Sequence, residues 1–178
     1  RHVLPALIFA SARAAVPFTP LNYRLSTEGL HQLLDRLPSV LVVADDDYVD
    51  MVAGAGKQVL RSGEFLAAAR AADPVEQFAD PDDVGIVLFT SGTTSRPKAV
   101  ELTHNHLTSY VTGTVEFASA GAEDASLVCV PPYHIAGVGA ALSNLYAGRK
   151  IVYLPRFDAR EWVRLVREEK VTTATVVP

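Results

Sequence analysis

The chain has 178 residues, of which 49% are apolar, and a formal net charge of −4. This length and composition are typical of one globular domain, or of a piece of a larger one, with enough apolar material for a core. Its Lys and Arg residues are not clustered as a nucleic-acid-binding surface requires, so no nucleic-acid partner is expected. A single Cys excludes an internal disulfide and a Cys-based metal site, and it favours a reducing, cytoplasmic setting.

The sequence shows neither a membrane span nor a signal peptide. It contains no run of about 18 uncharged apolar residues. Its most apolar stretch, residues 3–18, includes Arg13 and two prolines and lacks the order of regions found in a signal peptide. The chain begins with Arg1 and ends in a strand-like Val-Val-Pro run, so we expect a fragment of a longer sequence.

In the first part of the chain, helical and strand patterns alternate. Ser26 is a favourable N-cap for a helix with leucines at helical spacing. A β-branched apolar run bounded by Pro38 and an Asp cluster predicts a buried strand at residues 40–44. The expected helices are residues 3–15, 26–37, 46–53 and 64–72, and the expected strands are residues 16–20, 40–44 and 58–60.

Residues 73–83 form a polar connector. This stretch holds Pro74, Pro81 and several aspartates, a composition that favours an irregular linker. We expect any sub-boundary within the partial domain of residues 1–178 to lie in it.

Beyond the connector the alternation continues. Thr103 and Asp158 are favourable N-caps, and Gly148 is a favourable C-cap. The expected strands are residues 84–90, 99–102, 127–130, 150–154 and 172–177, and the expected helices are residues 103–117, 135–146 and 159–169. Near-continuous apolar strands alternating with helices predict an α/β fold, with mostly parallel sheets flanked by helices on both faces.

The segment from Thr90 to Lys98 carries the clearest chemistry. It reads Thr-Ser-Gly-Thr-Thr-Ser-Arg-Pro-Lys between two expected strands. Hydroxyl groups, the backbone N–H groups of a glycine-containing turn and one ammonium together suit a polyphosphate. The segment is not a Walker A motif, because no Gly precedes Lys98 directly and Ala99 follows it. The plainer alternative is a solvated turn with a surface Lys.

The ordered string resembles the phosphate loop of the adenylate-forming superfamily, which includes acyl- and aryl-CoA synthetases, luciferases and peptide-synthetase adenylation domains. The superfamily pattern is Thr-Ser-Gly-Thr-Thr-Gly-x-Pro-Lys-Gly, from which this chain departs at Ser95 and Ala99. Three further segments resemble superfamily motifs: residues 16–25, residues 102–105 (Leu-Thr-His-Asn) and residues 130–137 (Val-Pro-Pro-Tyr-His-Ile-Ala-Gly). The last is similar to Pro-x-Phe-His-x-x-Gly.

The resemblance implies roles for individual residues. The phosphates of ATP would be surrounded by Thr90, Ser91, Gly92, Thr93, Thr94, Ser95 and Lys98. Thr90 would also touch Mg²⁺, the alternative being a strand-end hydroxyl bonded to the backbone. His134 would lie at the acyl-substrate pocket, where it would orient the carboxylate or gate entry. The alternative is a His that packs and caps a helix. Lys98 and His134 are the expected catalytic residues.

The resemblance also implies an activity. Superfamily members use ATP to convert a carboxylic acid to an acyl-adenylate, and a thiol, usually CoA, then takes the acyl group. We therefore expect part of the large N-terminal domain of an acyl-CoA synthetase, with a place in fatty acid metabolism. The motifs that supply the Mg²⁺-binding Glu and the ribose-binding Asp, and the small C-terminal domain, are not among these residues. The fragment alone is thus expected to be inactive.

Two alternatives remain open: an adenylation domain that loads a carrier protein, and a non-catalytic nucleotide-binding relative, which Ser95 and Ala99 keep possible. Self-association to a homo-oligomer is also possible, since a partial domain exposes apolar surface. Elsewhere we expect His104 and His106 on a helix surface and Cys129 as an inert core thiol. The charged residues of 159–169 are expected to form a solvated helix face.

Overall fold

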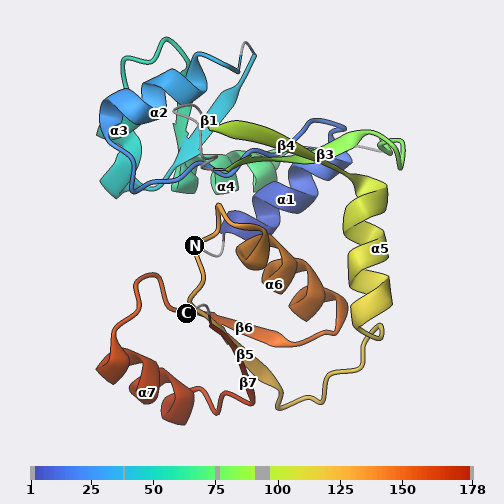
Figure 1. Ribbon diagram of the computed structural model, residues 1–178. Helices are drawn as coiled ribbons and strands as arrows, with labels where there is room; N and C mark the ends of the chain where they lie inside the picture. The colour runs from blue at the N-terminus through green and yellow to red at the C-terminus, as the bar shows by residue number, and fades with distance from the viewer. Residues whose placement is uncertain (1–2, 38, 75–76, 91–96, 177–178) are drawn as a thin grey trace. The chain divides into compact units, whose positions relative to one another are not determined.

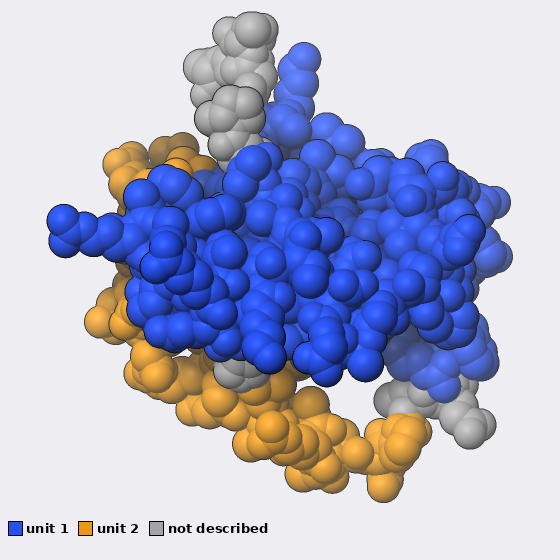
Figure 2. Space-filling view, turned by 90° about the horizontal axis from the view of Figure 1, so that it is seen from below, with its two compact units in different colours: residues 1–20, 77–178 blue, residues 21–76 orange. Residues whose placement is uncertain are grey.

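The computed structural model describes residues 3–37, 39–74, 77–90 and 97–176, which fall into two compact units. Unit 1 comprises Arg1–Pro20 and Gln77–Pro178, and unit 2 comprises Leu21–Glu76 (Figure 2). The second division point lies within the 73–83 connector. The first lies after Pro20, so the N-terminal segment belongs with the second half of the chain.

Unit 2 is a small α/β unit. Its elements are α2 (Thr27–Leu34), β1 (Leu41–Ala44), the 3₁₀ turn η1 (Asp46–Tyr48), α3 (Val49–Val52), β2 (Gln58–Arg61) and α4 (Ser62–Ala71) (Figure 1). β1 and β2 pair in parallel. The Ser26 hydroxyl accepts a hydrogen bond from the Gly29 N–H at 3.1 Å, which confirms the predicted N-cap. A core of Leu30, Leu34, Val42, Ala44 and Val52 holds the helices on the strands.

Unit 1 contains the segment with the predicted chemistry. Its elements are α1 (Val3–Arg13), β3 (Val84–Thr90), β4 (Lys98–Thr103), α5 (His104–Thr114), β5 (Ala125–Val128), α6 (Ile135–Tyr146), β6 (Lys150–Tyr153), α7 (Ala159–Glu168) and β7 (Thr173–Thr175) (Figure 1). Thr103 and Asp158 accept bonds from the N–H groups of the third residue beyond each, as N-caps do. Gly148 has a φ of 75°, which is the left-handed conformation of a helix C-cap.

The sheets agree with the predicted α/β class and differ from it in one respect. β5 lies between β6 and β7 and is parallel to both, whereas β3 and β4 are antiparallel. The alternation had predicted mostly parallel sheets, and the β3–β4 pair is the antiparallel exception. A parallel pair needs a crossover of roughly a dozen residues or more, so the short connection of residues 91–97 permits only a hairpin.

The strand expected at residues 16–20 does not form. Phe18 makes a single bridge to Ile86, donating to Gly85 O and accepting from Val87 N, each at 2.9 Å. Pro17 and Pro20 flank it, and proline has no N–H to extend a ladder. The segment is therefore tied to β3 at one point.

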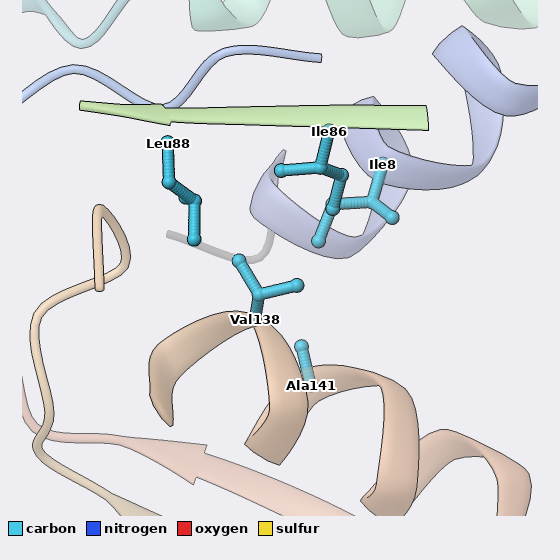
Figure 3. Close-up of a cluster of buried hydrophobic side chains, with 5 residues drawn as sticks. All are labelled: Ile8, Ile86, Leu88, Val138 and Ala141. Carbon is cyan, nitrogen blue, oxygen red and sulfur yellow. The ribbon is translucent and has the colours of Figure 1, made fainter. Parts of the chain in front are cut away.

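The main core of unit 1 joins α1, β3 and α6. It consists of Ile8, Ile86, Leu88, Val138 and Ala141. Figure 3 shows Ile86 and Leu88 projecting from the strand toward Val138 and Ala141 of the helix. None of the helices in the described ranges is long and apolar enough to cross a membrane.

A second cluster packs α6 against β5 and β6. Val128, Val130 and Ala140 form its buried part, and the Tyr153 ring packs against them. The Tyr153 hydroxyl is buried and has no hydrogen-bond partner among the described residues. An unpaired buried hydroxyl costs about 1–3 kcal/mol, so the ring stabilises this cluster and the hydroxyl does not.

Replacing Tyr153 by Phe tests this assignment. At neutral pH we expect the free energy of unfolding to stay the same or to rise by about 1 kcal/mol. Burial raises the pKa of the Tyr153 phenol, so the unfolded chain loses this proton first as the pH rises. Wild-type stability should therefore fall above about pH 10, and Tyr153→Phe should lack that part of the fall.

Urea unfolding at about pH 7 and about pH 10.5 would measure both effects. Tyr110→Phe is the matched control, because Tyr110 is 54% exposed. A Tyr153→Phe variant that is clearly less stable than wild type at neutral pH would contradict the assignment.

Candidate functional site

Thr90 and Lys98 form the base of the phosphate-loop segment. Thr90 is the last residue of β3, Lys98 is the first residue of β4, and the two are direct partners in the antiparallel register. The Thr90 hydroxyl donates a hydrogen bond to the Lys98 carbonyl oxygen at 3.4 Å. Both residues are exposed. The two chain ends that carry residues 91–97 are thus held side by side.

This contact is long for an O–H···O hydrogen bond, whose usual length is about 2.5–3.0 Å. A hydroxyl has one hydrogen to donate and two lone pairs. While the hydrogen points at the Lys98 carbonyl, the lone pairs remain available to a donor or a cation. The backbone bond matches the plainer alternative for Thr90 and is also compatible with cation binding.

His134 stands at the N-terminus of α6. It is the N-cap residue, its side chain makes no capping hydrogen bond, and it is exposed. Its ring lies beside that of Tyr133, with centroids 5.3 Å apart. Of the alternative, a His that packs and caps the helix, the structure has the N-cap position and the packing beside Tyr133 but no capping bond from the side chain. The side chain is presented to solvent by a helix whose next turns are buried.

The packing of β3 on α6 directs Thr90 and His134 toward the same end of the interface. Side chains two apart on a strand share a face, so Thr90 continues the row of Ile86 and Leu88. His134 is the N-cap residue, with an extended backbone (φ −99°, ψ 149°), and it lies at the N-terminal end of the helix, before Val138. In Figure 3 the step from Ile86 to Leu88 and the step from Ala141 to Val138 run in the same direction.

The other predicted positions gave mixed outcomes. His106 caps α5, its Nδ1 accepting from Thr103 N at 3.2 Å, and it is exposed as expected. His104 is half-buried: a Cβ on Gly85 would lie 2.9 Å from its ring, so the expectation of a surface position was wrong for it. Because Gly85 has no side chain, the ring can lie against the strand backbone.

Cys129 and α7 carry no sign of a site. Cys129 is half-buried, and its thiol donates to Thr175 O at 3.4 Å. Burial raises the pKa of this thiol, which lowers its reactivity as expected for an inert Cys. Arg164 forms ion pairs with Glu161 and Glu168 on the solvated face of α7. In the part of the chain that the structure describes, no group of three or more His, Cys, Asp or Glu side chains is able to hold a metal ion.

The remaining phosphate-loop residues, Ser91, Gly92, Thr93, Thr94 and Ser95, lie outside the described residues. The fold thus places three of the predicted site residues, Thr90, Lys98 and His134.

Comparison with known proteins decides the family. The sequence matches the AMP-binding enzyme family over residues 1–178. The chain belongs to this family. Its fold agrees with that assignment, since similar solved structures include the N-terminal domain of FACL13 from Mycobacterium tuberculosis (TM-score 0.82, 23% identity, 97% of this chain and 46% of that one). ATP-bound MatB from Rhodopseudomonas palustris is also similar (TM-score 0.79, 26% identity, 98% of this chain and 37% of that one).

Relatives of this AMP-binding chain are ligases. A fatty acid–acyl-carrier-protein ligase from Streptomyces coeruleorubidus is 31% identical, over 97% of this chain and 36% of its own length. A feruloyl-CoA synthase from Amycolatopsis is 33% identical, over 96% of this chain and 35% of its own length. The chain therefore spans about a third of the length of the curated relatives it matches.

The sequence predicts a phosphate loop in this AMP-binding chain, and it left open whether the Thr90 hydroxyl bonds the backbone. The hydrogen bond from Thr90 to the Lys98 carbonyl follows from the strand register, which no residue type encodes. The short connection between the two strands is the feature of the sequence that predicts the hairpin. Strands at 84–90 and 98–103 joined by residues 91–97 are too close for a crossover, and a hairpin brings Thr90 opposite Lys98.

Proposed function

We propose that this chain is part of the N-terminal domain of an ATP-dependent acid–thiol ligase and forms the nucleotide-phosphate side of its active site. One observation carries the proposal: the phosphate-loop string of an AMP-binding family member is mounted on a closed hairpin, with exposed Thr90 and Lys98 paired at its base. The strand ladder holds the two described ends of this string, Thr90 and Lys98, opposite each other. Such preorganisation is what stabilises developing charge efficiently.

The proposed reaction joins two anions. A carboxylate oxygen forms a bond to the α-phosphorus of ATP, the bond from that phosphorus to pyrophosphate breaks, and an acyl-adenylate results. The thiol of CoA then displaces AMP at the acyl carbon. The Lys98 ammonium, together with the loop donors, lowers the repulsion between the carboxylate and the triphosphate. The positive charge also stabilises the departing pyrophosphate.

Thr90 contributes to this chemistry by binding Mg²⁺ through its hydroxyl oxygen. Its oxygen lies 3.4 Å from the Lys98 carbonyl oxygen, which is long for an O–H···O hydrogen bond, and its lone pairs are open to a cation. Hydroxyl oxygens of this kind suit Mg²⁺, which takes hard oxygen ligands and usually keeps several waters and phosphate oxygens. We therefore assign Thr90 to the Mg²⁺ that accompanies ATP, in addition to its place beside the phosphates.

His134 serves the acid substrate. It is exposed, and the packing of Leu88 on Val138 directs it toward the same end of the β3–α6 interface as Thr90. An imidazole there would orient the carboxylate or gate its entry. We also propose that the acid is a fatty acid, as expected above, and that the protein is cytoplasmic.

Lys98→Ala tests the role of the loop. In the full-length protein that carries this chain, ATP–pyrophosphate exchange should fall by roughly 10²-fold or more, since losing one group that stabilises transition-state charge typically has that effect. Lys150→Ala is the matched control. Lys150 pairs with Glu169 at 2.6 Å on an exposed surface, and removing such a pair changes little.

The isolated 178-residue chain belongs in the same assay. We expect it to show no exchange, because only part of the ATP site lies within it. Normal exchange by the Lys98→Ala enzyme would refute the proposed loop function. Nucleotide binding by the full-length protein without exchange, across a panel of acids, would favour the non-catalytic alternative.

Thr90→Val and Thr90→Ser test whether the Thr90 hydroxyl binds Mg²⁺. Valine keeps the shape and removes the hydroxyl, so the Mg²⁺ concentration needed for half-maximal exchange should rise by about ten-fold, the equivalent of 1.4 kcal/mol. Serine keeps the hydroxyl and should stay within about three-fold of wild type, a difference below 1 kcal/mol. Exchange should be titrated with Mg²⁺ at fixed ATP. An unchanged Mg²⁺ requirement in Thr90→Val would rule out the cation role.

A carrier protein is the second candidate acceptor. The observation in its favour is the 31% identity to a fatty acid–acyl-carrier-protein ligase, close to the 33% identity to a feruloyl-CoA synthase. We expect the full-length protein, supplied with an acid that supports exchange, to form acyl-CoA and to leave a phosphopantetheinylated carrier protein unloaded. Mass spectrometry of both products would measure this. Loading of the carrier without acyl-CoA formation would reverse the choice.

A further inference from the structure

We propose that Gly137 is a positioning residue for His134: by having no side chain it lets the Pro131–His134 turn fold directly onto the first turn of α6, which fixes where the His134 ring stands. The functional consequence rests on the role of His134 proposed above. The geometry stands by itself.

The contact at Gly137 is made by backbone alone. A Cβ on Gly137 would lie 2.4 Å from the Pro131 carbonyl oxygen, 2.9 Å from Pro132 Cα and 3.0 Å from Pro131 C. Real Cβ atoms essentially never approach other atoms this closely. A flexible side chain could turn away, but these atoms belong to the main chain, so any residue larger than Gly forces the turn to move.

The turn and the helix start are linked through the same few groups. His134 N donates to Pro131 O at 3.1 Å, and the Gly137 and Val138 N–H groups donate to His134 O at 2.9 and 3.3 Å. Each proline ring fixes its own φ, which leaves the turn little freedom to rearrange. The His134 backbone is therefore held from both sides.

Both ends of this segment are anchored in cores. Val130 is 6% exposed, and Val138 is fully buried between β3 and α6. Neither anchor can move without opening a packed cluster, which costs more than bending a surface turn. The displacement caused by a Cβ at Gly137 is thus expected to fall on residues 131–134, and His134 is one of them.

Gly139 provides a matched control within the same helix. A Cβ there would lie 3.3 Å from the Tyr110 ring, and Tyr110 is an exposed side chain that can shift. Gly137 and Gly139 are both buried helical residues without a positive φ, so replacing either by Ala favours the helical backbone. A difference between the two variants therefore reports the contact with the turn.

The experiment compares Gly137→Ala, Gly139→Ala and His134→Ala in the full-length protein. The first readout is the imidazole ¹H–¹³C NMR signal of His134, assigned by its loss in His134→Ala. The second is the KM for the acid and the KM for ATP in pyrophosphate exchange. Gly137→Ala should shift the His134 signal and raise the acid KM about ten-fold or more, since small misplacements at a reacting centre have effects up to about 10²-fold. The KM for ATP should stay within about two-fold, and Gly139→Ala should match wild type in every readout.

A folded Gly137→Ala protein whose His134 signal coincides with that of wild type would overturn the inference, whatever its activity. If Gly137→Ala does not fold, Pro132→Ala takes its place, because it loosens the turn without adding atoms. It should shift the same signal to a smaller extent, and an unshifted signal would again overturn the inference. If Gly137→Ala moves the signal while His134→Ala keeps a wild-type acid KM, the positioning stands and the proposed role of His134 fails.

Discussion

The packing of β3 on α6 is the contact on which the candidate site depends. Ile86 and Leu88 meet Val138 and Ala141 in a cluster whose members are almost fully buried. The strand then continues into the phosphate-loop segment, and the helix begins at His134. Because protein cores are close-packed and yield little, this cluster sets how the two functional segments lie relative to each other.

The hairpin supplies the second constraint. Its ladder pairs every position from Ile86 to Thr90 with β4, and the last pair is Thr90 with Lys98. A register slip of one residue would turn Leu88 away from the core, so burial of Ile86 and Leu88 specifies the register. The position of Lys98 is thus fixed by apolar residues that never contact a substrate.

Local signals in the sequence were sufficient for many elements. The caps at Ser26, Thr103 and Asp158 and the strand at residues 84–90 follow from neighbouring residues, and the structure has all of them. Non-local features did not follow. Residues 1–20 join a unit that resumes at Gln77, and the His104 ring lies against Gly85, because contacts between distant segments leave no periodic pattern. Parallel pairing was inferred from apolarity, which cannot distinguish a covered hairpin from a crossover.

The positions of the exposed residues of the candidate site depend on buried parts of the chain. Thr90, Lys98 and His134 are all exposed, so their side chains contribute little to folding and are available for chemistry. Their positions come from backbone: a strand ladder for the first two, and the prolines and Gly137 for the third. Substitutions at the three side chains should therefore affect catalysis with little loss of stability. Substitutions beneath them should move a side chain whose own chemistry is intact.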